Sequence, residues 1–203
     1  MERREIIMMI PKSARGQKTR EKLLRAAEKV FGDKGYYESS ISEITTKAGL
    51  GSGTFYIYFS SKYEIFEALV KNLNHELRKS IKIGTNGLES REEIERKGFE
   101  LFFDFVKKHR RFYRIVRQSE YLDLDLFKWY YSSISKGYSE GLQEAFENGE
   151  FASNDAELIS YALMGIADFI GLRYEVWEES LDGPKFKNLM NFIFNGLKGE
   201  REK

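Results

Sequence analysis

Residues 40–62 read SISEITTKAGLGSGTFYIYFSSK, and the organisation of the whole chain follows from this stretch. Ser40 can cap the N-terminus of a helix, and Glu43, three residues further on, completes a capping box. Gly49 stands where that helix must end, at a position that often needs a positive φ. A second short helix follows and carries the aromatic residues of 55–59. Two helices joined across a tight glycine turn form a helix-turn-helix, whose second helix can enter the major groove of DNA.

This stretch and its flanks resemble the DNA-binding region of the tetracycline-repressor (TetR) family of bacterial regulators. The resemblance covers roughly the first third of the chain and needs no gaps. A lone helix-turn-helix pattern is a weak signal, whereas an ordered series of this length is a strong one. The residues that carry it are Thr19-Arg20-Glu21, Ala26-Ala27, Phe31, Lys34-Gly35-Tyr36, Ile44, Ala48-Gly49-Leu50, Gly53-Thr54-Phe55-Tyr56, Tyr58-Phe59 and Ser61-Lys62.

Length and composition bound the class of protein. The chain has 203 residues, of which 41% are apolar and 15% aromatic, enough for one large or two small domains with a core. No run of eighteen apolar residues is present, so we predict no membrane span. The absence of cysteine excludes disulfides and thiol chemistry and fits a cytoplasmic protein.

The distribution of charge is asymmetric, although the net charge is only +1. Residues 12–62 contain ten Lys or Arg against five Asp or Glu, and residues 63–203 contain 21 against 25. A basic segment around the helix-turn-helix and an acidic remainder fit DNA binding at one end of the molecule. An ordinary solvated surface would show a similar excess, so the motif carries most of this prediction.

Apolar periodicity predicts an all-α fold of about nine helices, with no strand-like alternation. We expect a flexible basic arm over residues 1–16, which either reaches DNA or is a frayed terminus. A helix-turn-helix DNA-binding domain follows over 17–62, and a helical ligand-binding and dimerisation domain over 63–203. The expected helices cover about 17–33, 40–48, 54–59, 61–81, 90–108, 112–116, 123–148, 154–179 and 184–198, with a second capping box of Ser61 and Glu64 at the start of the fourth.

The resemblance implies a homodimer in which the last two helices pair across a two-fold axis. Small and apolar residues there permit close approach, and a wide apolar face on a terminal helix is well explained by an interface. Packing within one chain must take up some of these residues. The candidates are Ala162, Gly165, Ile166, Phe169, Phe186, Leu189, Met190, Ile193, Phe194 and Leu197.

The resemblance also implies which residues face double-stranded DNA. Family members often place a hydroxyl residue on a phosphate at the start of the second helix and a lysine on a phosphate at the start of the fourth. Carried over by position, the expected contacts are Ser40, Ser42, Ser52, Gly53, Thr54, Tyr56, Tyr58 and Lys62.

This sequence departs from the family pattern in its DNA-facing residues. Ser42 stands where many members have a base-reading Arg, Gly51-Ser52 where many have Ser-Lys, and Ile57 where a His is common. The sequence therefore offers few long polar side chains for direct hydrogen bonds to base edges. Thymine methyl contacts, water bridges and DNA shape would carry more of the specificity. We expect Phe55, Ile57 and Phe59 to belong to the domain core.

In this family the larger domain usually binds a small-molecule effector. Aromatic residues that could line such a site suit apolar, aromatic or flat cationic ligands, although at helical spacing most of them would be ordinary core. The candidates are Phe99, Phe102, Phe103, Tyr113, Phe127, Tyr130, Tyr161 and Phe169.

No catalytic or metal-binding set is recognisable. The two histidines, His75 and His109, fall on different predicted helices, and no HExxH or nucleophile-elbow motif is present. We therefore expect no enzyme activity, no cofactor and no metal. The sequence predicts a transcriptional regulator, most simply a repressor released from a palindromic operator by a small hydrophobic or aromatic ligand. The alternative is a helical ligand carrier without sequence-specific DNA binding.

Overall fold

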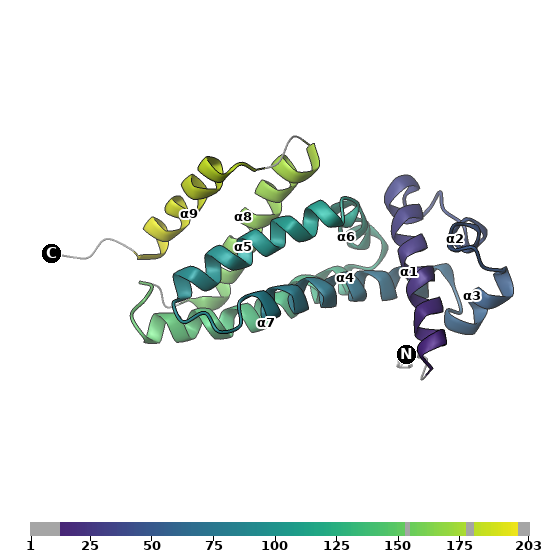
Figure 1. The fold of residues 1–203 in the computed structure, drawn as a ribbon, viewed down its shortest axis with the longest axis horizontal. Coiled ribbons are helices and arrows are strands. Elements are labelled where there is room, and N and C mark those ends of the chain that lie inside the picture. Colours follow the sequence, from purple (N-terminus) through teal and green to yellow (C-terminus); the bar gives the residue numbers. More distant parts are fainter. Residues whose placement is uncertain (1–12, 153–154, 178–180, 199–203) are drawn as a thin grey trace.

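The computed structural model describes residues 13–152, 155–177 and 181–198. Within these ranges the chain is helical throughout, which confirms the expected all-α class. The elements are α1 (Ala14–Lys34), α2 (Ile41–Ala48), α3 (Ser52–Tyr58), α4 (Lys62–Gly84), α5 (Arg91–Lys108), α6 (Phe112–Leu122), α7 (Leu124–Glu147), α8 (Ala156–Gly171), a π-helical segment (Leu172–Trp177) and α9 (Gly183–Lys198). Figure 1 shows α1–α3 at one end, a bundle of α5–α9 at the other, and α4 running from the first into the second.

The small end is held by one apolar core. Phe31 of α1, Ile44 of α2, Phe55 of α3 and Phe66 of α4 are all fully buried. Phe31 meets Phe66 edge-on, with ring centres 5.4 Å apart. Burial of several large side chains from four helices makes the orientation of α2 and α3 depend on α1 and α4.

The helix boundaries of the small end follow the expected local chemistry. The Ser40–Glu43 capping box is present in both directions, and Gly49 adopts φ 66° at the end of α2, as predicted. The second box forms only in part, because the Oγ of Ser61 accepts from the Glu64 amide while the Glu64 carboxylate accepts from the amide and hydroxyl of Ser60.

The start of α1 differs from the prediction. The helix begins at Ala14 rather than near residue 17, because the Ser13 hydroxyl caps it by accepting from the amide of Gly16 at 3.1 Å. Most of the expected basic arm, residues 1–12, lies outside the described residues.

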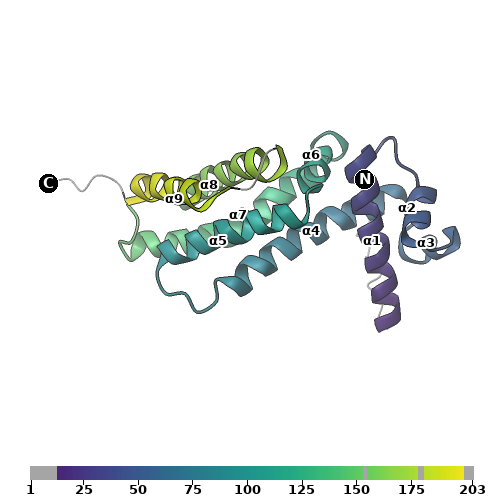
Figure 2. The ribbon, with the colours of Figure 1, turned by 45° about the horizontal axis from the view of Figure 1, so that its top comes forward.

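The larger domain is layered around α5. In both views α9 and α4 lie on opposite sides of α5, and α8 lies beside α9 (Figures 1 and 2). The α5 side chains Phe102, Phe105 and Val106 are buried, as expected of a helix covered on several sides. No helix in the described parts of the chain has the length and apolar content to span a membrane.

The helix predicted over 154–179 is interrupted. Regular α8 ends at Gly171, and the next six residues form the π-helical segment. A Cβ at Gly171 would lie 2.4 Å from the hydroxyl oxygen of Tyr113 and 3.2 Å from the Phe102 ring. Only glycine permits this close packing against α5 and α6. The apolar periodicity of the sequence does not reveal such a contact between distant residues, so it did not predict the change from α-helix to π-helix.

Candidate nucleic-acid interface and effector cavity

The short helix α3 presents two opposite faces. Phe55 and Phe59 point inward and are 0% and 2% exposed, as predicted, whereas Tyr56 and Ile57 are 60% and 66% exposed. The expectation that Ile57 belongs to the core was therefore wrong. With Phe55 and Phe59 inward at i and i+4, residues 56 and 57 fall on the outer face of the helix, a signal that was available in the sequence.

The remaining expected DNA contacts lie around this outer face. Ser40, Ser42, Ser52 and Gly53 are exposed, while Thr54 and Tyr58 are half-buried. The Ser40 hydroxyl donates to the Glu43 carboxylate at 3.0 Å. Any phosphate contact from Ser40 must therefore compete with, or add to, its capping role.

Lys62 has other partners than those implied by the resemblance. Its Nζ donates to the carbonyl oxygens of Tyr36 and Ser39, both at 2.8 Å, and to that of Tyr37 at 3.4 Å. It also lies 4.5 Å from the centre of the Tyr36 ring. Three acceptors use the three donors of an ammonium group, so in this structure Lys62 holds the turn between α1 and α2. A phosphate contact by Lys62 would have to replace one of these bonds.

We expect Tyr56→Ala to weaken binding to specific DNA by about 1–2 kcal/mol, a fivefold to thirtyfold loss, because Tyr56 stands at the centre of the outer face of α3. Titration of labelled upstream DNA and a scrambled duplex measures this. The control is Tyr37→Ala, whose ring is 73% exposed but lies outside α3. Equal losses on both duplexes would show that Tyr56 does not read sequence.

A cavity of about 660 Å³ opens between α6, α7 and α8. Three of the expected effector residues line it, namely Phe127, Tyr161 and Phe169. The cavity lies within the size range of small-molecule sites, about 300–1,000 Å³. It is the structural candidate for the effector site.

The other five expected effector residues do not line this cavity and lie in the apolar core of this structure. Their rings are at most 8% exposed, and they pack against one another and their neighbours, as in the edge-on contact of Phe102 with Phe103 at 5.8 Å. The residues are Phe99, Phe102, Phe103, Tyr113 and Tyr130.

The cavity also holds a carboxylate that the sequence analysis did not single out. Asp168 Oδ2 accepts from the Tyr131 hydroxyl at 2.9 Å. Burial raises the pKa of Asp168 to about 6, although the Tyr131 hydrogen bond and the Arg117 charge oppose this effect. Nothing in the local sequence distinguishes Asp168 from an exposed helical aspartate.

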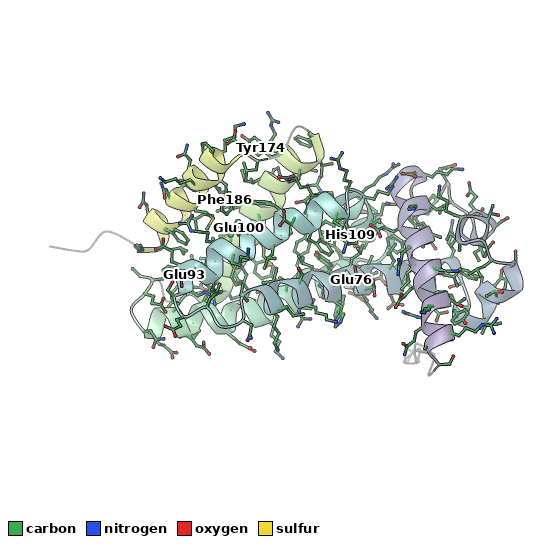
Figure 3. The ribbon with its side chains drawn as sticks, in the orientation of Figure 1. Glu76, Glu93, Glu100, His109, Tyr174 and Phe186 are labelled. Atoms are coloured by element: carbon green, nitrogen blue, oxygen red, sulfur yellow. The ribbon has the colours of Figure 1, made fainter. Side chains whose placement is uncertain are left out.

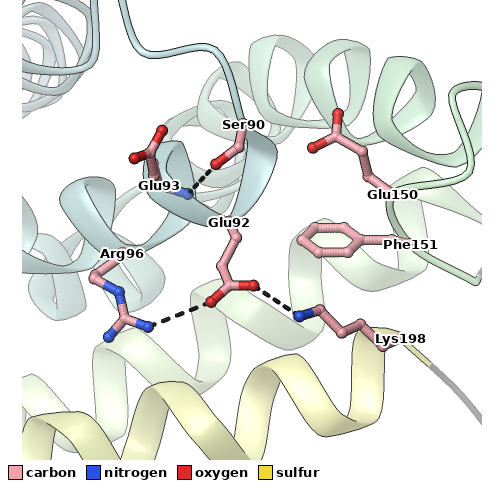
Figure 4. Close-up of a pocket in the computed structure, with 7 residues that line it drawn as sticks. All are labelled: Ser90, Glu92, Glu93, Arg96, Glu150, Phe151 and Lys198. Carbon is pink, nitrogen blue, oxygen red and sulfur yellow. Dashed lines mark hydrogen bonds and ion pairs between the residues drawn. The ribbon is translucent and has the colours of Figure 1, made fainter.

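A second hollow, of about 390 Å³, lies at the end of the bundle remote from α1–α3. Its central carboxylate, Glu92, is paired with Lys198 at 2.8 Å and Arg96 at 3.5 Å (Figure 4). The Glu92–Lys198 pair ties α9 to α5. We assign this hollow a structural role.

The expected dimer surface divides into two groups. Met190, Ile193, Phe194 and Leu197 are at most 7% exposed within a single chain, so these four are corrected to core. Ala162, Gly165 and Phe169 are exposed, and Ile166, Phe186 and Leu189 are half-buried. Phe186 packs edge-on against Phe103, with ring centres 6.2 Å apart.

Three further exposed apolar residues lie near this surface and were not among its predicted members, and one of them, Tyr161, also lines the cavity. Leu158 and Tyr161 lie on the same face of α8 as Phe169, and Phe192 on α9 is 71% exposed.

Helix α6 joins the cavity to the small end. The last carbonyl groups of α1 lack partners within the helix, and α6 supplies them: Arg114 donates to the carbonyl oxygens of Gly32 at 2.8 Å and Asp33 at 2.6 Å. Arg111 also pairs with the Asp33 carboxylate at 2.6 Å. The same helix carries Arg117, which lines the cavity.

A second connection lies beside it. His109, at the end of α5, contacts the Glu28 carboxylate of α1 at 2.9 Å, and Glu76 of α4 lies 3.8 Å from its other nitrogen. Figure 3 shows His109 and Glu76 at the end of the larger domain nearest to α1.

Three features define the class as a helix-turn-helix DNA-binding protein: the apolar core that α1–α4 share, the exposed outer face of α3 and the helical second domain. Comparison with known proteins agrees. Residues 23–69 match the family model described as bacterial regulatory proteins, tetR family. The chain is 32% identical over 133 residues to the uncharacterized HTH-type transcriptional regulator YvdT of Bacillus subtilis, an alignment that covers 63% of this chain and 68% of YvdT.

Two further likenesses are informative. The chain is 34% identical over 107 residues to the HTH-type transcriptional activator FasR of Mycolicibacterium smegmatis, covering 51% of this chain and 47% of FasR, so it spans about half the length of that relative. The solved structure of the fatty acid degradation regulator FadR from Bacillus halodurans matches with a TM-score of 0.78 over 90% of this chain and 97% of that chain, at 22% identity. At that identity the match shows a shared fold.

The chain belongs to the tetR family of bacterial regulatory proteins. It is a DNA-binding transcriptional regulator and not an enzyme, and its helix-turn-helix, α2 and α3, binds operator DNA.

Proposed function

We propose that the protein is a homodimeric repressor that leaves a palindromic operator when a small hydrophobic or aromatic molecule enters the cavity between α6, α7 and α8. The observation that carries this proposal is the double role of α6. Its Arg117 lines the cavity, and its Arg114 holds the end of α1. A ligand that favours one position of α6 would thereby bias the orientation of the DNA-binding end.

The exposed apolar surface supports the dimer. Leu158 on α8 and Phe192 on α9 are 63% and 71% exposed, and apolar patches of this kind are typical of interaction sites. Two copies related by a two-fold axis would present two α3 helices to successive major grooves, about 34–36 Å apart or slightly more. Binding to chromosomal DNA would place the protein in the cytoplasm.

The proposed DNA contacts are the exposed positions around α3. We retain Ser40, Ser42, Ser52, Gly53, Thr54, Tyr56 and Tyr58, and we add Ile57 because its side chain is 66% exposed there. An isoleucine at this position suits the methyl group of thymine.

The test is a titration of the full chain with its own upstream DNA and a scrambled duplex at several salt concentrations. A preference of about 10³ or more for the upstream DNA supports a sequence-specific regulator. Equal, steeply salt-dependent affinities would indicate backbone attraction alone and favour the ligand-carrier alternative. Sedimentation must give twice the mass of the 23.8 kDa chain.

A reporter assay separates repression from activation, which matters because one relative, FasR, is named an activator. Reporter expression from the upstream DNA should rise when the gene for this protein is deleted. A fall on deletion would overturn the repressor assignment.

Arg114→Ala should loosen the connection between the two ends of the molecule. Two hydrogen bonds from a charged donor to the end of α1 are lost, which should cost about 1–2 kcal/mol. Hydrogen exchange should show faster exchange in α1 with unchanged protection in α5 and α8. Arg110→Ala is the matched control, since the described residues give Arg110 no bond to α1; uniform loss of protection would argue against a local connection.

A further inference from the structure

The cavity between α6, α7 and α8 holds a carboxylate, that of Asp168, of which one oxygen is hydrogen-bonded to a neighbouring side chain. Asp168 Oδ2 accepts from the Tyr131 hydroxyl at 2.9 Å. Oδ1 has no hydrogen-bond partner among the described residues. A carboxylate withdrawn from water without full compensation is costly to keep ionised. Such a group binds a cation more favourably than it binds a neutral or anionic molecule.

The walls around this carboxylate are aromatic. Phe127 and Tyr131 come from α7, Tyr161 and Phe169 from α8, and Tyr121 from α6. Aromatic faces attract organic cations. Tyr121, Tyr161 and Phe169 are 84%, 42% and 67% exposed in the single chain, so their faces are open to a ligand that enters from solvent. Ion pairing and cation–π attraction therefore favour the same sign of ligand charge.

Other charged groups at the cavity are exposed and nearly balanced. Arg117 and Glu120 lie on α6, and Lys128 lies on α7. All three side chains belong to exposed residues, so water screens their effect on a ligand. Asp168 is the charged group set most deeply in the cavity wall.

We propose that this cavity binds a lipophilic organic cation, with Asp168 as its counter-ion and the surrounding aromatic rings as its cage. The inference rests on the proposed function, because it names the chemical class of the effector at the same site. A ligand with an anionic head, such as a fatty acid, is disfavoured because its charge would lie against Asp168 without a buried cation to balance it.

The test uses two probes of the same shape and opposite charge. Calorimetric titration of the full-length protein at pH 7.5 compares tetraphenylphosphonium, a permanent cation, with tetraphenylborate, a permanent anion. We expect the cation to bind at least tenfold more tightly. Tighter binding of tetraphenylborate, or of oleate as a representative fatty acid, would overturn the proposal, as would no binding of tetraphenylphosphonium.

Substitution of the carboxylate locates the effect. Asp168→Asn keeps the shape and should weaken tetraphenylphosphonium binding about tenfold or more. Glu140→Gln removes an exposed carboxylate of α7 that does not line the cavity and should change the affinity less than about twofold. Asp168→Glu retains the charge and should recover much of the affinity, so a loss caused only by misfolding is recognisable. Equal affinities of Asp168→Asn and the unchanged protein would overturn the proposal.

The pH dependence gives an independent readout. The pKa of Asp168 is about 6 in the free protein, and a bound cation favours the ionised form. Affinity for tetraphenylphosphonium should therefore be constant above pH 7 and fall below pH 6, by up to about tenfold per pH unit. The probe does not titrate, so the change belongs to the protein.

Several other titratable groups lie on the elements around Asp168, and the variant separates their effects. The pH dependence should disappear in Asp168→Asn, and its persistence there would contradict the assignment. These groups are Tyr113, Arg117 and Glu120 on α6, Lys128, Tyr130 and Tyr131 on α7, Tyr161 on α8 and Glu175 on the π-helical segment, with His109 at the end of α5.

The two proposals fail in different ways. If the protein binds its upstream DNA but tetraphenylphosphonium neither binds nor weakens that binding, the effector class is wrong and the regulator stands. If the protein binds the cation but shows no DNA preference, the proposed repressor function fails and the cation site stands.

Discussion

Phe31→Ala is expected to lower the free energy of unfolding of the DNA-binding end by about 3–5 kcal/mol, the usual cost of removing a buried phenylalanine ring. Phe31 is 0% exposed. Its ring meets Phe66 of α4 at 5.4 Å and stacks on Tyr36 at 5.7 Å. One side chain thus joins α1, the following turn and α4.

The consequence for DNA binding should be as large as that for stability. A loss of this size is a substantial part of the 5–15 kcal/mol that stabilises a typical protein. Denaturant unfolding followed by circular dichroism measures the loss, and DNA titration should show a reduced active fraction. Ile83→Ala is the control, because its side chain is 66% exposed and lies on the part of α4 remote from Phe66. Similar destabilisation by both substitutions would contradict the assigned packing.

Lys62→Met should also destabilise the small end, by about 2–4 kcal/mol, because three carbonyl oxygens lose a charged donor while the apolar part of the side chain is retained. The acceptors belong to Tyr36, Tyr37 and Ser39. They lie between α1 and α2 and would otherwise be satisfied only by water.

Salt dependence distinguishes this structural role from a phosphate contact. Loss of one phosphate contact reduces the slope of log K against log salt by about 0.9. We expect an unchanged slope for Lys62→Met at temperatures where the protein is folded, together with a lower unfolding midpoint. The control is Lys47→Met, an exposed lysine near the end of α2, which should leave the midpoint unchanged. A reduced slope with unchanged stability for Lys62→Met would restore the phosphate contact that the resemblance implied.

Local features of the small end could be read from neighbouring residues. A capping box depends on residues three apart, and the end of α2 depends on a glycine that tolerates φ 66°. The exposure of Ile57 was also accessible, because helical geometry alone sets it opposite Phe55 and Phe59. That error came from treating an apolar side chain as core without testing its place on the helix.

The structural role of Lys62 could not be inferred from its neighbours in the sequence. Its acceptors lie 23 to 26 residues earlier in the chain, and a lysine at a helix start is equally compatible with a phosphate contact. The burial of Met190 and Phe194 was ambiguous in the same way, because an apolar stripe fits a dimer interface and an intrachain core equally well. Only the position of α9 against the rest of the bundle separates these possibilities.

The sequence by itself determined the all-α class, the helix-turn-helix and the family, because these depend on periodicity, capping and an ordered motif within one segment. The tertiary structure decided where the effector cavity lies, that Asp168 is set among aromatic rings, and that α6 links this cavity to α1. These properties arise where α6, α7 and α8 meet, from residues as far apart as Arg117 and Phe169. Burial and pairing depend on such non-local packing, which no local pattern of residue types specifies.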